Sequence, residues 1–359
     1  MKILIVNQHK EDVLGGSEIQ CDLIAKYLTK FGHTVIYGAI NGKSESYNTK
    51  YTVNKISRSS KSIIQLCKKV QPDVVYWRFN KHLFYKTVKA IKQQKIPIVF
   101  GISHINDVTR FAYKPSTTKN IISTLLKKYR QQLISAYNYR GINHLQGIIA
   151  QNNSQYNLIQ SNNKIQIYSS VIGKLVIFNW KKPYCVWVAN IKKSKNPEEF
   201  IRLARKFENK EIDFIMVGKI QQNNYEFIEK GIDLPKNFVY LGPKTYEEVN
   251  GILKNSLFMI HTCNPEGFPN NFMQAWKQAK PTISLYFDPN GFITSERIGF
   301  YSKSREQMQL DVEKLIDDEE LRNEMGHQAY RFAHENFDPN QNINKLERFL
   351  KEIVNGFNK

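Results

Sequence analysis

Short apolar runs alternate with amphipathic stretches along both halves of this chain of 359 residues. A short apolar run is typical of a parallel strand buried on both faces, and an amphipathic stretch is typical of a helix that covers the sheet. In regular alternation they predict a parallel sheet with helices on both faces. The expected strands are residues 3–7, 34–39, 73–78, 97–103, 147–151 and 164–169 in the first half, and 185–190, 214–218, 238–241, 257–262 and 281–286 in the second.

Two such series predict two Rossmann-like, doubly wound α/β domains, and the length of the chain agrees with two domains. The series separate near residues 173–183, where Gly173 and the sequence Lys181-Lys182-Pro183 interrupt two hydrophobic runs. We therefore expect domains at residues 1–175 and 176–338, and a terminal helical segment at 339–359. The expected helices are residues 17–31, 62–70, 83–93, 198–207, 246–254, 305–317, 318–336 and 341–357.

The positive charge of the chain lies almost wholly in its first half. Residues 1–180 contain 26 Lys and Arg against 7 Asp and Glu, whereas residues 181–359 contain 26 against 25, so the first half holds +19 of the formal net charge of +20. Such a domain should attract polyanions or an anionic membrane surface. No RNA- or DNA-binding motif accompanies the charge, so nucleic acid is not an expected partner.

Composition narrows the class of protein further. No apolar run approaches the length of a membrane span, and residues 1–6 are too short and too soon polar for a signal peptide. The four cysteines are scattered, which favours a reduced, cytoplasmic setting. There is no Asp-x-Asp pair and no His/Cys cluster, so the sequence predicts neither a metal site nor a cofactor.

The segment 265–276 carries the clearest chemical signal. It follows the apolar run 257–260, contains a Gly-bearing turn, and continues into a stretch without β-branched residues that predicts a helix. A strand, a turn and a helix start in this order present free backbone N–H groups, which bind phosphate. Glu266 beside such an anion site suggests hydrogen bonds to neutral groups such as sugar hydroxyls. The alternative is an ordinary strand-to-helix turn, with Pro265 and Pro269 as turn residues.

Two further sites lie in the first half. Gly15 and Gly16 precede Ser17 at the start of the first long helix, where paired glycines let a ligand approach the backbone; a flexible turn is the alternative. The spacing is not Gly-x-Gly-x-x-Gly, which disfavours a nicotinamide or flavin enzyme. His104 follows the strand-like run 97–103, and the carboxyl ends of such strands carry binding sites, although a lone histidine is more often structural.

The segment that begins with Glu266-Gly267-Phe268-Pro269 resembles the donor-sugar loop of retaining glycosyltransferases of family 4. That family has Glu-Gly-Phe-Gly/Pro and a second acidic residue eight positions after the first, where this chain has Gln274. The resemblance implies that Glu266 holds hydroxyls of the donor sugar and that Gln274 contacts the nucleotide ribose, as donor and acceptor. It also implies that a glutamate at position 274 would preserve or raise activity. The other donor-binding residues implied in this loop are Gly267, Phe268, Pro269, Asn270 and Asn271.

The same resemblance extends to other segments. Gly15 and Gly16 match the family's Gly-Gly loop near the donor phosphates, and His104 matches its first-domain histidine beside the transferred sugar. Lys195 matches a lysine that binds the donor diphosphate. Asn190 stands where the family usually has arginine, so Lys195, helped by Lys192 or Lys193, must neutralise more of the charge. Gly218, at the end of the expected strand 214–218, is expected to be a further donor-binding residue.

The fold implied is GT-B: two Rossmann-like domains facing a cleft, with the donor in residues 176–338, the acceptor in residues 1–175, and the terminal helix packed back on the first domain. The implied activity is retaining, metal-independent glycosyl transfer, in which His104, Glu266 and Lys195 serve catalysis. A UDP-sugar is the expected donor ahead of a GDP-sugar. The expected acceptor is an anionic glycan or lipid-linked intermediate of bacterial surface polysaccharide, such as lipopolysaccharide, reached from the cytoplasm at the inner face of the plasma membrane.

Three other functions stay open on the sequence alone. A nucleotide-sugar epimerase can share this architecture, the departures at Asn190 and Gln274 suit a catalytically silent sugar-nucleotide or membrane-binding subunit, and the charge would suit nucleic acid. Residues 114–140 also have two interpretations. They form either a packed helix, which is favoured, or a surface amphipathic helix that touches lipid. The residues behind the second interpretation are Leu125, Leu126, Leu133, Ile134, Lys127, Lys128 and Arg130.

Overall fold

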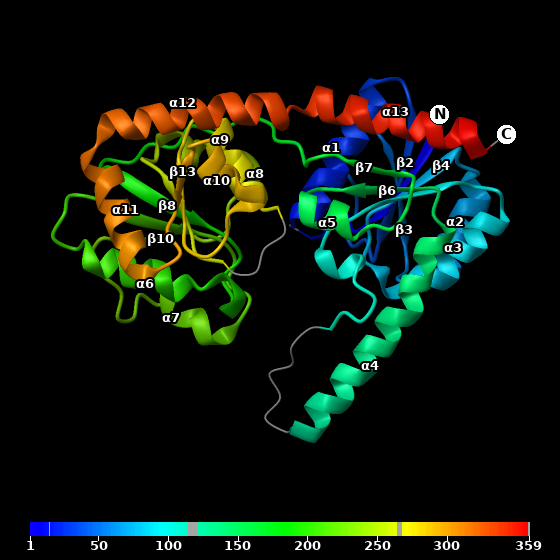
Figure 1. Cartoon of the computed structure of the whole chain (residues 1–359), viewed down its shortest axis with the longest axis horizontal. Coiled ribbons are helices and arrows are strands. Elements are labelled where there is room, and N and C mark those ends of the chain that lie inside the picture. The colour runs from blue at the N-terminus through cyan, green and yellow to red at the C-terminus, as the bar shows by residue number, and fades with distance from the viewer. Residues whose placement is uncertain (14, 114–120, 264–267, 358–359) are drawn as a thin grey trace. The chain divides into compact units, whose positions relative to one another are not determined.

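The computed structural model describes residues 1–13, 15–113, 121–263 and 268–357. The chain forms two compact units, each with its own parallel sheet (Figure 1). Unit 1 consists of Met1–Ser170 and Pro339–Lys359, and unit 2 consists of Val171–Asp338. The predicted fold class is confirmed, because both sheets are entirely parallel in their described strands and are covered by helices.

The sheet of unit 1 has seven strands in the order β3-β2-β1-β4-β5-β6-β7. Their apolar runs are buried, as in β1, where five of the six residues are buried. The order of the strands reverses direction between β1 and β4, which is where ligands bind in sheets of this kind. The strands are β1 (Lys2–Asn7), β2 (Thr34–Ile40), β3 (Thr52–Ile56), β4 (Val74–Trp77), β5 (Ile98–Gly101), β6 (Gly147–Ala150) and β7 (Lys164–Gln166).

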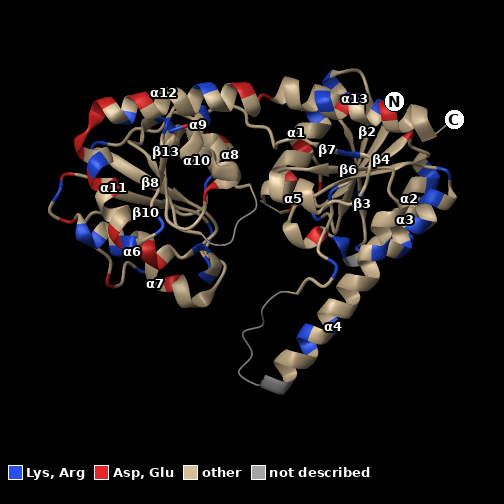
Figure 2. Ribbon diagram, in the orientation of Figure 1, with Lys and Arg blue, Asp and Glu red and all other residues tan. Residues whose placement is uncertain are grey.

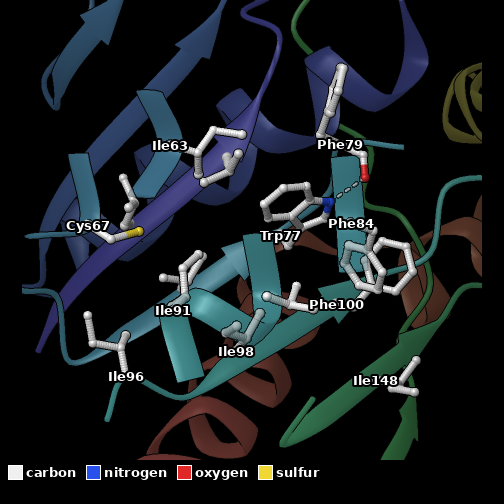
Figure 3. Packing of buried hydrophobic residues seen from close by; sticks show 14 of the residues in the cluster. Ile63, Cys67, Trp77, Phe79, Phe84, Ile91, Ile96, Ile98, Phe100 and Ile148 are labelled. Atoms are coloured by element: carbon white, nitrogen blue, oxygen red, sulfur yellow. Dashed lines mark hydrogen bonds between the residues drawn. The ribbon is translucent and has the colours of Figure 1, made fainter. Parts of the chain in front are cut away.

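Aromatic and branched side chains fill the core beside this sheet. Figure 3 shows Trp77 of β4 packed near Phe84, with ring centroids 5.4 Å apart, and Phe84 packs in turn on Phe100 at 4.7 Å. The indole Nε1–H of Trp77 donates to the carbonyl oxygen of Phe79 at 2.6 Å, which satisfies its only buried polar group. The helices of unit 1 are α1 (Gly16–Lys30), α2 (Ser60–Val70), α3 (Phe84–Gln93), α4 (Ile121–Tyr139), α5 (Asn153–Leu158) and α13 (Pro339–Phe357).

The terminal helix α13 packs on unit 1, although it follows unit 2 in the sequence. It lies against α1, and its Phe349 approaches Gly147 of β6 so closely that a side chain at Gly147 would overlap the ring. His33, which follows α1, is hydrogen-bonded through Nε2 to Glu347 Oε1 of α13 at 2.8 Å. The predicted return of the terminal helix to the first domain is confirmed by these contacts.

The sheet of unit 2 has six strands in the order β10-β9-β8-β11-β12-β13, and its order reverses between β8 and β11. The strands are β8 (Tyr184–Val188), β9 (Asp213–Val217), β10 (Phe238–Tyr240), β11 (Met259–His261), β12 (Thr282–Ser284) and β13 (Gly299–Tyr301). The helices are α6 (Pro197–Lys206), α7 (Glu226–Glu229), α8 (Tyr246–Asn255), α9 (Asn270–Lys277), α10 (Phe292–Ser295), α11 (Arg305–Asp317) and α12 (Glu319–Asn336).

The structure divides the chain between Ser170 and Val171, five residues before the predicted boundary at 175/176. The residues in between belong to unit 2 because they are hydrogen-bonded to α8. Asn250 of that helix donates through Nδ2 to the carbonyl oxygen of Ile172 at 3.0 Å, and the Val176 N–H donates to the carbonyl oxygen of Glu247 at 3.0 Å. Backbone contacts of this kind leave no mark in the sequence of the segment itself.

Two strands were absent from the prediction, β3 and β13. Both lie at an edge of their sheet. Edge strands can have one side open to solvent, so they need no continuous apolar run. In β3 only Ile56 is fully buried, and β13 is three residues long.

Helix α4 lies within the segment 114–140 for which two interpretations were open, and residues 114–120 are outside the described part. Figure 1 shows α4 extending away from the rest of unit 1. Leu125, Leu126 and Leu133 are exposed on it. The favoured interpretation as a packed helix is therefore wrong for these residues. Among the described residues, no helix is long and apolar enough to cross a membrane.

Candidate functional site

Most predicted donor-binding residues of unit 2 gather at the carboxyl ends of β8 and β11, where the strand order reverses. Asn190 and Lys195 lie in the segment between β8 and α6. Asn270 and Asn271 open α9, which follows β11. In open α/β sheets this position is the usual ligand site, because the loops that leave the two strands diverge there.

Hydrogen bonds join these two segments directly. The carbonyl oxygen of Lys195 accepts from Thr262 Oγ1 at 2.7 Å, and Asn196 Nδ2 donates to the carbonyl oxygen of Thr262 at 3.0 Å. From the other side, Asn271 Nδ2 donates to the carbonyl oxygen of Val188, the last residue of β8, at 2.7 Å. The backbone around Lys195 is therefore fixed to the end of β11, and the start of α9 is fixed to the end of β8.

Gly218 supports the same segment from β9. Its φ of +154° is one that residues with side chains rarely adopt, and an added Cβ would overlap the carbonyl oxygen of Ala189. The Ile191 N–H donates to the carbonyl oxygen of Lys219 at 2.9 Å, so the chain after β8 runs alongside the chain after β9. Gly218 thus lets these backbones approach each other and fixes the position of Asn190.

Helix α9 begins at Asn270 with Pro269 as its N-cap, and no acidic residue lies in its first turn. Its positive end is therefore not neutralised within that turn. By contrast, α6 carries Glu198 and Glu199 in its first turn. Of the two helices at this site, α9 is the one whose N-terminus suits an anion.

Phe268 precedes α9 and is buried in an aromatic cluster of unit 2. Its ring lies 5.5 Å from that of Phe337 and 6.1 Å from that of Phe292. This packing fixes the end of the predicted donor loop to the core beneath α9. Glu266 and Gly267, the first two residues of that loop, lie outside the described residues, so their predicted roles stay predictions.

Gln274 is buried in α9 and hydrogen-bonded to α8. Its Nε2 donates to Asn250 Oδ1 at 2.9 Å and to the carbonyl oxygen of Tyr246 at 3.3 Å. The orientation of the Asn250 side-chain amide is fixed, because its Nδ2 donates to the carbonyl oxygens of Ile172 and Lys174 and a reversed amide would lose both hydrogen bonds. The amide nitrogen of Gln274 therefore has a structural role between two helices, whatever its oxygen contacts.

Burial lowers the pKa of Lys195, and the charge of Lys192 acts in the same direction, while Cys263 opposes both. Burial and the neighbouring Lys195 also lower the pKa of His261 to about 3, so this histidine of β11 is neutral at ordinary pH. Burial raises the pKa of the Cys263 thiol to about 11. Among these three groups, Lys195 is the cation, and its environment favours an anionic partner.

In unit 1 the predicted residues lie at the carboxyl ends of β1 and β5. Gly15 is the extended N-cap of α1, which starts at Gly16. Ser17 Oγ lies 3.2 Å from Asn7 Nδ2 of β1 and 3.2 Å from Ser103 Oγ, which follows β5. The Gly-Gly turn is thereby tied to the ends of two strands, next to the reversal of strand order between β1 and β4.

His104 is the N-cap of a short 3-10 helix, Ile105–Asp107. Its ring Nδ1 accepts from the backbone N–H of Asn106 at 3.1 Å, and the backbone N–H of His104 donates to Asp107 Oδ2 at 2.9 Å. Because Nδ1 is an acceptor, the neutral ring carries its proton on Nε2. The structural alternative for this residue therefore has support, and a catalytic role through Nε2 stays a prediction.

Arg78 is not among the site residues predicted from the sequence. It follows β4 directly, is 6% exposed, and donates from one guanidinium nitrogen to Tyr76 Oη at 3.1 Å. Its Nε has no partner among the described residues, and it lines a cavity of about 20 Å³ with Gln20, Tyr76 and Asn342. That volume holds about one water molecule, so it is no sugar site. An arginine directly after an apolar strand is the signal that could have drawn notice to it.

The comparisons with known proteins agree with this arrangement. Residues 176–332 match the family model of glycosyl transferases group 1. Sucrose-phosphate synthase from Thermosynechococcus elongatus is similar with a TM-score of 0.76 and 9% identity, over 99% of this chain and 100% of that one. No match was found among curated proteins.

Two other solved structures are similar over nearly their whole length. WaaG, a glycosyltransferase involved in lipopolysaccharide biosynthesis, has a TM-score of 0.71 and 13% identity, over 96% of this chain and 98% of that one. An alpha-glucosyltransferase in complex with UDP has a TM-score of 0.64 and 12% identity, over 98% and 100% of the two chains. At such identities the likeness concerns the fold. Residues 176–332 match the model of the glycosyl transferases group 1 family, within a chain whose two Rossmann-like units have the GT-B fold.

Proposed function

We propose that the protein is a retaining, metal-independent glycosyltransferase that uses a nucleotide-diphosphate sugar, with a UDP-sugar favoured over a GDP-sugar. Unit 2 would hold the donor and unit 1 the acceptor. The family match of residues 176–332 supports a nucleotide-sugar enzyme, and the solved alpha-glucosyltransferase of similar fold holds UDP. His104 and Glu266 are proposed to act at the transferred sugar and Lys195 at the donor diphosphate.

The observation that carries the proposal is the position of Lys195 and the α9 N-terminus. Lys195 lies beyond β8, α9 follows β11, and hydrogen bonds connect the two segments. A diphosphate at this point would meet a lysine side chain and the positive end of a helix at once. The lowered pKa of Lys195 supports this assignment, because a bound diphosphate would restore the charge that burial disfavours.

The proposed reaction transfers the sugar to an acceptor hydroxyl on the same face from which the diphosphate departs. The acceptor oxygen bonds to the anomeric carbon as the bond from that carbon to the phosphate oxygen breaks, and the departing phosphate takes the hydroxyl proton. Lys195 and the N–H groups of α9 would stabilise the charge on the leaving diphosphate. Glu266 would position the sugar and not attack it, unlike the carboxylate nucleophile of a retaining glycosidase.

The acceptor is proposed to be an anionic glycan or a lipid-linked intermediate of surface polysaccharide assembly. The charge of unit 1 is the supporting observation, and Figure 2 shows lysines and arginines over α2, α3 and α4. The similar fold of WaaG, which is involved in lipopolysaccharide biosynthesis, agrees with this class of acceptor. With a lipid-linked acceptor, the protein would act at the cytoplasmic face of the plasma membrane.

Donor binding tests the proposal most directly. Thermal unfolding of the protein should shift upward with one nucleotide sugar or its nucleoside diphosphate, because a ligand of the folded state stabilises it in proportion to its affinity. Lys195→Ala should weaken that binding by about tenfold or more, as expected for a charged partner of a diphosphate. The loss of affinity with rising pH should also begin below the range of an ordinary lysine, because the pKa of Lys195 is lowered.

Lys206→Ala is the matched control, since Lys206 is an exposed lysine of the same unit in the last turn of α6, outside the loop that carries Lys195. It should change binding far less than Lys195→Ala does. Equal effects of the two variants would contradict the specific role of Lys195. Release of nucleoside diphosphate that depends on an added acceptor then separates a transferase from an epimerase.

A second function has two observations in its favour. The amide nitrogen of Gln274 is engaged by Asn250 and Tyr246, and Asn190 supplies no charge at the usual arginine position. A subunit that binds sugar nucleotides without transfer would tolerate both features. Tight donor binding without nucleoside diphosphate release, over a panel of acceptors, would favour this alternative.

A further inference from the structure

Helix α4 presents an apolar face to solvent. Leu126 is 64% exposed, Tyr129 63% and Leu133 51%, and Tyr137 continues the row at 40%. Positions 126, 129, 133 and 137 lie on one side of a helix, since steps of three and four residues return to the same side. Soluble proteins seldom leave such a row uncovered. We name this row, together with its neighbours Leu125 and Ile134, the α4 surface.

The opposite face of α4, which contacts the rest of unit 1, is polar. Ser135 is buried there, accepts from the Ala112 N–H at 3.1 Å and donates to the carbonyl oxygen of Arg110 at 2.9 Å. Asn138 is also buried and accepts through Oδ1 from the Tyr85 N–H at 3.3 Å. An ordinary surface helix buries its apolar face and exposes its polar one. In α4 this arrangement is reversed for Leu126, Tyr129 and Leu133, which are all more than half exposed. Tyr137, at the end of the row, packs edge-on against Tyr85 of α3, with ring centroids 5.1 Å apart.

Basic residues border the α4 surface, and α4 itself contains no acidic residue. Lys127 and Arg130 are exposed on α4 itself, and no Asp or Glu occurs between Asp107 and Glu198 in the sequence. The adjoining helix α3 adds exposed lysines on the same unit. An apolar face with basic residues at its borders matches a bilayer of anionic lipid, which offers both apolar chains and negative headgroups.

We propose that the α4 surface binds the protein to an anionic lipid bilayer, with α4 lying in the plane of the interface. This inference goes beyond the proposed reaction, since it concerns the docking of unit 1 and holds for either donor. A second copy of the chain fits the α4 surface less well. Two such helices side by side would bring Lys127 and Arg130 near their own copies, with no acidic residue of α4 to pair with them.

Sedimentation of the full-length protein with lipid vesicles tests the proposal. We expect binding to phosphatidylcholine vesicles that contain phosphatidylglycerol, and much weaker binding to phosphatidylcholine alone. Combined Leu126→Ser, Tyr129→Ser and Leu133→Ser should weaken binding at least tenfold, because apolar area no longer enters the interface. Combined Lys127→Ser, Lys128→Ser and Arg130→Ser should weaken it on the order of a hundredfold at low salt, at about fivefold per charge, and less at high salt.

Matched control variants distinguish the effect of α4 from the general effect of removing exposed apolar residues or positive charge. Ile232→Ser with Leu310→Ser removes two residues of unit 2 that are as exposed as those of α4, and Lys206→Ser with Lys230→Ser and Lys236→Ser removes the same charge from unit 2. Both controls should bind vesicles as the parent does. Circular dichroism and donor-induced thermal shift should be unchanged in all variants, which separates a failure of docking from a failure of the proposed reaction.

Two results would overturn the proposal. One is vesicle binding by the serine variants of α4 equal to that of the parent. The other is a dimer of the parent in lipid-free solution that the Leu126, Tyr129 and Leu133 variant converts to a monomer, measured by light scattering, because it would assign the α4 surface to a second copy of the chain.

Discussion

Unit 1 contains 29 lysines and arginines against 9 aspartates and glutamates, whereas unit 2 contains 23 of each, so unit 1 carries the whole net charge of +20. The sheets of the two units are built alike, with parallel strands whose order reverses beside β1 and beside β8. Their surfaces therefore differ for reasons other than the fold. The positive electrostatic potential of unit 1 attracts a large, anionic partner over a distance. Unit 2 has no net charge, so it must recognise its ligand by direct contacts within a site.

The candidate residues of the two units differ in the same way. In unit 2 they are fixed by close backbone contacts, as Gly218 against Ala189 and Asn271 against Val188 show. In unit 1 exposed apolar and basic side chains lie on α4. This helix extends from the unit and is hydrogen-bonded to it through Ser135 and Asn138. We infer that unit 2 is built for a small ligand held in one geometry and unit 1 for a large surface.

Glu266→Ala should produce the largest effect and would test the division of labour between the units. If Glu266 binds sugar hydroxyls chiefly in the transition state, turnover should fall on the order of a hundredfold or more while vesicle binding by unit 1 stays unchanged. Glu229→Ala, at an exposed glutamate of unit 2, is the control and should keep full turnover. A folded Glu266→Ala protein with the parent's rate would remove Glu266 from the donor site.

Gly218→Ala should produce the next largest effect, because it tests whether backbone contacts define the donor site. The added Cβ would overlap the carbonyl oxygen of Ala189 and displace the segment that carries Asn190 and Lys195. We expect a loss of about 1–3 kcal/mol in the free energy of unfolding, as for other forced overlaps, and weaker donor binding in the protein that remains folded. Urea unfolding and donor titration measure the two quantities.

Gly231→Ala provides the control for Gly218→Ala. Gly231 also has a positive φ, +67°, but nothing lies within 4 Å of an added Cβ. This variant should cost about 1–2 kcal/mol for the left-handed backbone and leave donor binding unchanged. Unchanged donor binding in Gly218→Ala as well would show that the contact with Ala189 does not define the site.

The sequence predicted the class of fold because buried parallel strands and amphipathic helices have distinct patterns, and the core strands lie within a few residues of their predicted positions. It missed β3 and β13, where an edge position removes the apolar run. It placed the boundary of the units late, because the hydrogen bonds from α8 to residues 172–176 depend on residues far away in the chain.

The candidate site was predictable to the extent that it consists of local motifs. Asn190, Lys195 and Asn271 follow strands, and their gathering at one edge of the sheet follows from strand order. The orientation of α4 was not predictable, because its pattern of apolar and basic residues is the same whether the apolar face is inside or outside. Only the burial of Ser135 and Asn138 decides that the apolar face points outward.

Gln274→Glu should have the smallest effect on turnover, and its effect on stability would sharpen the account of the donor site. The family resemblance implies that Gln274→Glu preserves activity, but Gln274 Nε2 donates to Asn250 Oδ1 and to the carbonyl oxygen of Tyr246. An ionised carboxylate there would face two acceptors, so we expect a loss of about 1–3 kcal/mol in the free energy of unfolding at neutral pH. Burial would raise the pKa of such a carboxyl in the folded state, so the loss should shrink as pH falls toward the unfolded value of about 4.3, where the protonated group can donate. Gln221→Glu, at an exposed glutamine, is the control and should show no such pH dependence. Urea unfolding of both variants at several pH values gives the measurement. If Gln274→Glu is as stable as the parent at neutral pH, these two hydrogen bonds do not explain why the chain has glutamine at this position.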